Sequence, residues 1–168
     1  QDLIGYCLHS GLLVPYFSWQ RSHAIHHART NHLDLGETHV PHRATSPSGK
    51  AWQWWQETVG DEAFAILTML IHFVFGWPAY LLAGASGGPT RGTTNHFWPA
   101  RPFSVALFPG GWKRKVWLSA FGVLGMLSLL GWWTYTAGFL PVLAIYVGPY
   151  LVVNFWLVLY TWLQHTDV

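Results

Sequence analysis

The chain has 168 residues, of which 51% are hydrophobic and only 10% are charged, and its formal net charge is +2 at pH 7. Ordinary globular domains contain about 25% charged residues, so the composition excludes a typical soluble domain. The small net charge and the lack of a long basic stripe argue against a nucleic-acid partner. The single cysteine, Cys7, excludes an internal disulfide and a cysteine-based metal site.

Residues 3–19 carry no charge but are slightly short for a full membrane span, which needs about 20 apolar residues. Gly5, Gly11 and Pro15 weaken a straight helix. We therefore expect an interfacial or half-inserted helix that leads to Arg21. The 12 Trp, 7 Tyr and 10 Phe residues suit a protein at a membrane–water interface.

A short polar run, residues 22–29, contains the pattern His-x-x-His-His. In a helix, His23, His26 and His27 occupy positions i, i+3 and i+4, so their rings leave one face together. Imidazole groups in this arrangement suit a first-row metal such as iron or zinc. The alternative is a polar histidine-rich turn on a basic surface, because Arg21 and Arg29 flank the run.

Residues 30–61 are the polar part of the chain and predict an aqueous loop with turns at Pro41 and residues 46–49. We expect the loop histidines, which are His32, His39 and His42, to be solvated rather than to bind a metal. Glu37 is either a solvated loop acid or a carboxylate that orients a ligand histidine.

Residues 63–115 predict a membrane-associated segment followed by an irregular, aromatic loop. The apolar run is expected to break at residues 76–78, and either a span or an interfacial helix fits it. His72 stands alone there, and a packing role is expected for it. The glycine-rich residues 84–92 lack the spacing of a phosphate-binding loop.

Residues 116–166 contain no Asp, Glu, Lys or Arg. This length accommodates two spans of about 20 residues each, and residues 137–141 divide them into a transmembrane hairpin. Gly148 and Pro149 should kink the second helix. The fold class predicted is therefore all-α: an integral membrane helical protein with a histidine-bearing helix on the cytosolic side, organised as a single domain over residues 1–168.

The distribution of charge predicts how the histidines meet. The basic cluster at residues 113–115 directly precedes the hairpin, and the positive-inside bias places it in the cytosol. The second helix then returns to the cytosolic side, where His165 emerges. Arg21 and Arg29 flank the histidine trio, and the same bias places the trio on the cytosolic side too. The sequence therefore predicts one cytosolic metal site made by His23, His26, His27 and His165.

Several runs resemble the membrane-bound fatty acid desaturases, specifically the Δ12 (oleate) acyl-lipid type, with a fungal character. The run at residues 13–27 (LVPYFSWQRSHAIHH) resembles the second histidine box of that family. The match continues at residues 36–41 (GETHVP), 76–81 (GWPAYL), 95–97 (NHF), 148–154 (GPYLVVN) and 160–167 (YTWLQHTD). Because the first and third boxes of the family are missing and the chain begins at Gln1, we interpret it as an internal, inactive fragment.

The resemblance implies a multi-pass membrane enzyme of the endoplasmic reticulum. Two iron ions would be held by histidine boxes, with His23, His26, His27 and His165 as the ligands in this chain. In related desaturases an Asn stands four residues before the last of these histidines, and here Thr161 replaces it. The resemblance further implies a membrane lipid substrate, dioxygen, cytochrome b5 as electron donor and a cis double bond as product.

Three readings stay open. A Δ12 desaturase has close relatives with the same boxes, namely ω3 desaturases, hydroxylases and conjugases. A zinc-dependent membrane hydrolase would need a general base beside the histidines, and Ala24 stands at that position. The third reading is a non-catalytic membrane scaffold. A homo-oligomer is compatible with all three.

Overall fold

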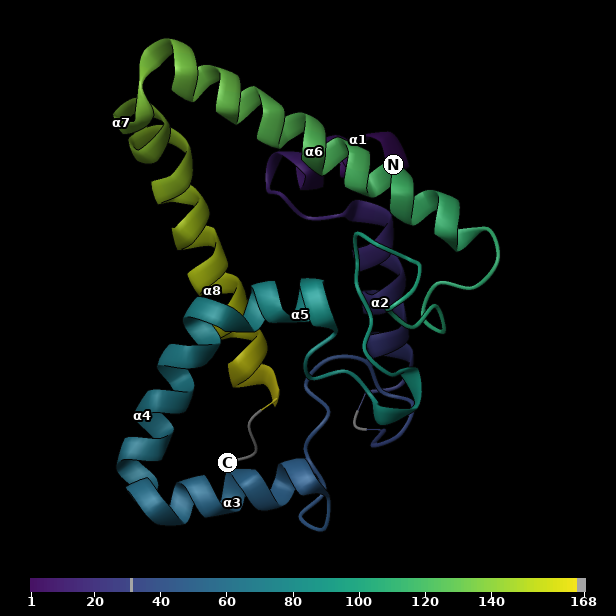
Figure 1. Ribbon diagram of the computed structural model, residues 1–168, viewed down its shortest axis with the longest axis vertical. Helices are drawn as coiled ribbons and strands as arrows, with labels where there is room; N and C mark the ends of the chain where they lie inside the picture. The colour runs from purple at the N-terminus through teal and green to yellow at the C-terminus, as the bar shows by residue number, and fades with distance from the viewer. Residues whose placement is uncertain (31, 166–168) are drawn as a thin grey trace.

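A computed structural model describes residues 1–30 and 32–165, and these residues form helices and loops without a strand. In chain order the helices are α1 (Asp2–Gly11), α2 (Tyr16–Ala28), α3 (Pro47–Val59), α4 (Asp61–Ile71), η1 (His72–Gly76), α5 (Trp77–Ala83), η2 (Pro89–Arg91), α6 (Trp112–Ala137), α7 (Phe139–Val142), η3 (Leu143–Val147) and α8 (Gly148–His165). The predicted all-α fold is thus confirmed (Figure 1). Thr166, where the predicted hairpin ends, lies outside the described residues.

Three helical stretches are long and apolar enough to cross a membrane. They comprise residues 61–83, 112–137 and 139–165, with mean hydropathies of 1.7, 1.6 and 2.0. Gly138 separates the last two and has a φ of +86°, a conformation that side-chain-bearing residues rarely adopt. The chain therefore turns where the sequence predicted, and α6 and α8 diverge from α7 (Figure 1).

The first and third of these stretches each contain a π-helical segment that ends two residues before a proline. The segment His72–Gly76 precedes Pro78, and Leu143–Val147 precedes Pro149. Proline lacks an N–H group and cannot close the ordinary helical bond, and a widened turn accommodates the lost bond without ending the helix. The helix therefore continues to Ala83, whereas the sequence predicted a break at residues 76–78.

The polar segment at residues 30–61 is not entirely a loop, because it contains α3. Ser46 caps this helix: its Oγ accepts a hydrogen bond from the N–H of Gly49 at 3.0 Å. Pro47 occupies the first turn, where its missing N–H costs nothing. The Ser-Pro-Ser-Gly run that predicted a turn is thus the start of a helix.

Helix α2, which carries the histidine motif, packs against α1 and α6. The Phe17 N–H donates to Ser119 Oγ at 2.9 Å, and Ser18 Oγ donates to the carbonyl of His96 at 2.6 Å. Arg21 is not a free surface charge, because it donates to the Leu107 carbonyl and its guanidinium lies 4.9 Å from the Trp112 ring centre. These buried contacts fix the position of the motif.

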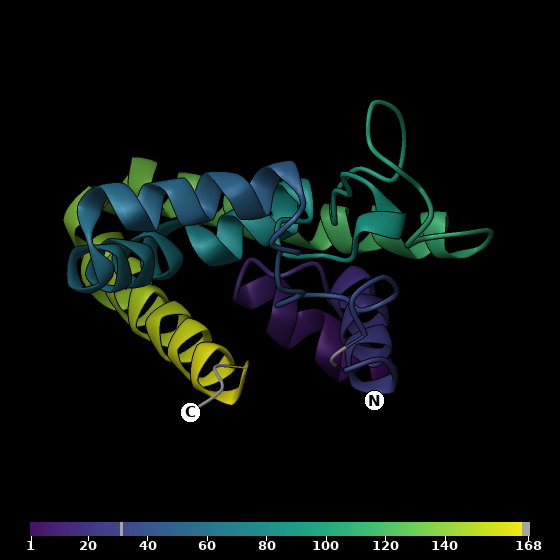
Figure 2. The ribbon, with the colours of Figure 1, turned by 90° about the horizontal axis from the view of Figure 1, so that it is seen from below.

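Close approach of α1 to α6 depends on a glycine. A Cβ at Gly122 would collide with the side chains of Ser10 and Tyr6. Tyr6 also donates through its hydroxyl to the Leu118 carbonyl at 3.0 Å. Figure 2 shows α8 and the pair α1–α2 projecting from the same side of the other helices, so the end of α8 can reach α2.

Candidate metal centre

The three motif histidines lie on one face of α2, as the spacing predicted. The rings of His23 and His27 meet edge to face with centres 4.4 Å apart, and the centres of His26 and His27 are 5.6 Å apart. Trp19, one turn before His23, stacks on its ring at 4.3 Å. The helical placement therefore holds, and the alternative of a histidine-rich turn does not.

His165, at the end of α8, reaches this face across the molecule. Its Nε2 atom lies 3.1 Å from Nε2 of His26. On the same face of α2, Nε2 of His27 lies 3.0 Å from Nε2 of His23. The four histidines predicted from the sequence are thus brought together as two pairs, His23–His27 and His26–His165.

The Nε2 atoms of His26 and His165 face each other, and their tautomers follow from the hydrogen bonds at Nδ1. Nδ1 of His26 is 2.7 Å from the Glu37 carbonyl, and Nδ1 of His165 contacts the Thr161 carbonyl. A carbonyl only accepts, so each Nδ1 carries the proton, and each neutral ring then has a bare lone pair at Nε2. Two lone pairs 3.1 Å apart repel, and either a proton on one Nε2 atom or a metal ion bound by both would remove this repulsion.

The separations within the pairs also suit metal binding. Two imidazole nitrogens bound at about 2.1 Å to one ion, at an angle of about 90°, lie about 3.0 Å apart. Each pair could therefore supply two ligands to one ion. In the part of the chain that the structure describes, no three His, Cys, Asp or Glu side chains form a complete ion site.

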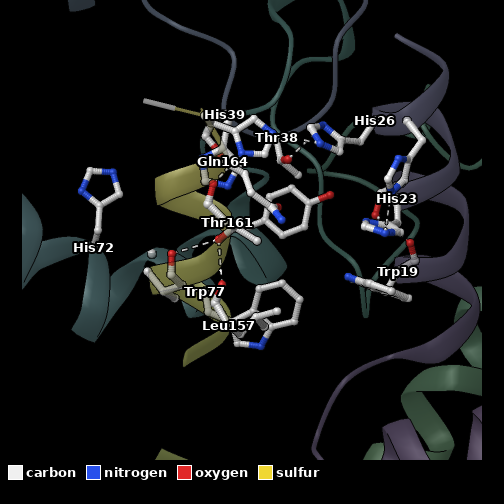
Figure 3. A pocket seen from close by; sticks show the side chains of 17 residues that line it. Trp19, His23, His26, Thr38, His39, His72, Trp77, Leu157, Thr161 and Gln164 are labelled. Carbon is white, nitrogen blue, oxygen red and sulfur yellow. Dashed lines mark hydrogen bonds between the residues drawn. The ribbon is translucent and has the colours of Figure 1, made fainter. Parts of the chain in front are cut away.

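The pairs line a cavity of about 160 Å³ with a largely apolar wall. Its walls come from α2, from the loop that follows α2, from α5 and from α8, and they include Trp19, Trp77 and Leu157. Figure 3 shows the α2 and α8 side chains facing this space from opposite sides. Such a cavity can hold an apolar segment next to the imidazoles.

Two further histidines, which the sequence did not assign to the site, also border the cavity. His39 was expected to be solvated, but its ring stacks on that of His165 with centres 4.4 Å apart. His72, on η1, donates through Nδ1 to the Thr68 carbonyl at 2.7 Å and stands apart from the other labelled histidines (Figure 3). The apolar context of His72 agrees with its expected packing role.

Glu37 is buried, with 1% of its surface exposed, so it is not a solvated loop acid. Its backbone carbonyl, rather than its carboxylate, orients His26. The carboxylate lies 2.9 Å from Arg91 Nε and accepts a long hydrogen bond from the Tyr80 hydroxyl at 3.4 Å. The Arg91 ion pair and the Tyr80 hydroxyl hold Glu37 in place. The Glu37 backbone carbonyl then accepts the Nδ1 proton of His26 and so sets its tautomer.

Burial favours the neutral form of the His23, His26 and His39 imidazoles. It lowers the pKa of His23, with a further decrease from His27 and His26. It also lowers the pKa of His26, against the opposing hydrogen bond to Glu37. Burial, with His165, lowers the pKa of His39 to about 4. Neutral imidazole is the form that binds metal ions, so the lowered pKa values of His23 and His26 favour metal binding at neutral pH.

Glu37→Gln is expected to remove part of the pH dependence of folding. Burial raises the pKa of Glu37 to about 7, against the opposing effects of Arg91 and Tyr80. Because the folded pKa exceeds the unfolded one, this carboxyl stabilises the fold below about pH 4.5, and the contribution is lost as pH rises through about 7. The loss is roughly 3 kcal/mol at most.

Thermal unfolding of the full-length protein in detergent at pH 5 and pH 7.5 measures this effect. The melting temperature of the wild type should fall more than that of Glu37→Gln over this interval. Glu62→Gln, at an exposed position of α4, is the matched control and should follow the wild type. Equal pH slopes for wild type and Glu37→Gln would contradict the assignment.

The helical fold, the three potential spans and the cavity with its histidines are features of a helical membrane protein with a polar site among its helices. Comparison with protein families gives the particular family: the model for fatty acid desaturases matches residues 1–168. The chain therefore belongs to the fatty acid desaturase family. The family assignment expected from the histidine box and its neighbouring runs is confirmed.

Curated relatives include several Δ12 desaturases. The chain is 40% identical over 177 residues to the Delta(12) fatty acid desaturase of Mortierella alpina, covering 99% of the chain and 43% of the relative. It is 34% identical over 165 residues to the omega-6 fatty acid desaturase, endoplasmic reticulum isozyme 2, of Glycine max, covering 98% and 41%. It is 33% identical over 165 residues to the oleoyl-12-hydroxylase of Ricinus communis, covering 98% and 40%.

The chain thus spans about two-fifths of the length of these relatives. No solved structure matches the chain. The fungal character of the resemblance agrees with the Mortierella relative.

Proposed function

We propose that the full-length protein introduces a cis double bond into a lipid-linked oleoyl chain and so forms a linoleoyl chain. The observation that carries the proposal is the pairing of the bare Nε2 atoms of His26 and His165 beside an apolar cavity. An imidazole pair that can bind a metal ion, next to a cavity for a segment of an acyl chain, suits metal-assisted oxidation of a lipid.

The two histidine pairs are proposed to contribute to two iron sites. His23 and His27 would hold one ion, and His26 and His165 the other, with the remaining ligands supplied by the rest of the protein. When bound, iron supplies the activation of dioxygen that removal of hydrogen from an unactivated methylene requires. The lipid loses two hydrogens from neighbouring carbons, and two further electrons and two protons complete the reduction of dioxygen to two waters.

The residues of this chain orient the ligands and exclude water. The Glu37 and Thr161 carbonyls hold the Nδ1 protons of His26 and His165, so that both Nε2 atoms face inward. Trp19, Trp77 and Leu157 line the cavity and would contact the acyl chain. Thr161 thus acts through its carbonyl, since its hydroxyl donates to the carbonyls of Leu157 and Val158.

The proposed setting is the endoplasmic reticulum membrane with the histidine pairs on the cytosolic side. The basic residues 113–115 at the start of α6 favour the cytosol for that end of the helix. Cytochrome b5, the proposed electron donor, would then deliver electrons from the cytosolic side.

Expression of the full-length protein in a yeast that makes no polyunsaturated fatty acids tests the proposal. We expect linoleate to appear in total lipids analysed by gas chromatography, with oleate reduced. The hydroxylase among the relatives gives a second candidate activity, and 12-hydroxyoleate in place of linoleate would identify it. Absence of both products, with the protein present in membranes and an active electron donor, would refute the proposed function.

A further inference from the structure

We infer that His39 is a positioning residue for His165: the stacked His39 ring holds the His165 imidazole in the orientation that faces His26. The inference rests on the proposed function, because it assigns a role at the proposed His26–His165 iron site. It concerns a loop residue outside the histidine box, one that the sequence pattern did not single out.

The contact itself is a parallel stack. The two ring centres are 4.4 Å apart and the ring planes differ by 13°. A stack of this kind covers one face of the His165 ring and blocks its rotation about the bond to Cβ. With the ring held in this plane, Nε2 of His165 stays 3.1 Å from Nε2 of His26.

His165 needs such a support because few contacts within its own helix hold its ring. Within α8 its ring has one polar contact, the hydrogen bond to the Thr161 carbonyl. One bond leaves the ring free to tilt, and the stack with His39 removes that freedom.

The backbone that presents His39 is unusual. Thr38 and His39 both have positive φ values, +58° and +49°, which are uncommon for residues other than glycine. The Val40 N–H donates to the Ser86 carbonyl at 3.0 Å, and Glu37 is fixed on the other side by Arg91. Strained conformations persist where the surroundings determine them, and they cluster at functional sites.

The geometry favours support over direct ligation by His39. The lone pairs of an imidazole lie in the plane of its ring, so two parallel rings 4.4 Å apart direct their lone pairs side by side. Such lone pairs do not converge on one ion. His39 therefore acts on the site through the ring face of His165.

Metal binding by full-length variants tests the inference. The variants are His39→Ala, His39→Phe and His42→Ala, purified in detergent without metal and titrated with Co²⁺, whose visible absorption reports histidine ligation. We expect His39→Ala to bind Co²⁺ about tenfold more weakly, in the range of supporting residues around metal ligands. His39→Phe, which keeps an aromatic face, should retain wild-type affinity and the wild-type spectrum.

His42→Ala is the matched control, because His42 lies in the same loop but is exposed and contacts Ser48 instead of the site. Equal affinity of His39→Ala and wild type would overturn the inference. Equal losses in His39→Phe and His39→Ala would overturn it too, because they would make a ring nitrogen of His39 the important group. A wild type that binds no Co²⁺ would instead refute the proposed metal centre, and the inference with it.

Discussion

Replacing His26 with alanine in the full-length protein is expected to abolish linoleate formation while leaving membrane insertion intact. His26 is the central residue of the site: its ring faces His165, lies beside His27 and is oriented by Glu37. Its loss would remove one proposed ligand and leave the lone pair of His165 without a partner. Mutation of a residue that only orients a metal ligand lowers metal affinity or activity about 10–100-fold, and loss of a ligand itself should lower them further.

The measurement is the linoleate content of yeast lipids, normalised to the amount of variant protein in the membrane fraction. His42→Ala serves again as the control, since it removes an imidazole from an exposed position. Its linoleate level should equal that of wild type. Linoleate above one tenth of the wild-type level in His26→Ala would contradict a ligand role for His26.

The histidine trio and its partner could be predicted because both depend on regular helix geometry. Spacing alone placed His23, His26 and His27 on one face, and the order of the two apolar helices brought His165 to the same side. These inferences need the helical repeat, the length of a membrane span and the positive-inside bias of the basic residues 113–115.

The surroundings of the trio could not be predicted, because they depend on irregular backbone and on partners distant in sequence. His39 reaches the site through two residues of positive φ, which no local pattern at Thr38 indicates. Glu37 is buried because Arg91 and Tyr80 meet it from other elements. A loop composition predicts solvation, and tertiary contacts override it here.

The start of α3 shows a different kind of error. Ser46 and Pro47 are as common in turns as at helix starts, so the polar context decided in favour of a turn. The missing signal was available: tryptophans at positions 52 and 55 share a helical face and pack on Phe64. The periodicity of the aromatic residues would have identified the helix.

Arg91→Ala is expected to destabilise the fold by about 1–3 kcal/mol at pH 7.5, the usual cost of leaving buried polar groups without their hydrogen-bonding partner. The Arg91 and Glu37 side chains are 15% and 1% exposed, so the Glu37 carboxyl group would stay buried without its cation and would be neutralised by a proton. Arg91 also donates to the Leu35 carbonyl at 2.6 Å, and this acceptor would lose its donor. Its Nε contacts the carboxylate as an ion pair rather than as a well-directed hydrogen bond.

Arg43→Ala is the matched control, because Arg43 pairs with Asp34 at 2.8 Å on the surface, where the side chains are 53% and 49% exposed. An exposed pair contributes at most about 1 kcal/mol. Urea or thermal unfolding in detergent should therefore separate the two arginine variants clearly.

The double variant Arg91→Ala/Glu37→Gln distinguishes loss of the charge pair from loss of packing. Without a carboxylate to leave unpaired, the double variant should be more stable than Arg91→Ala alone at pH 7.5, and it keeps the Glu37 backbone carbonyl that orients His26. Equal destabilisation by Arg91→Ala and Arg43→Ala would show that the buried Arg91–Glu37 pair does not stabilise the loop between α2 and α3. The orientation of His26 would then depend on the Glu37 backbone without help from Arg91.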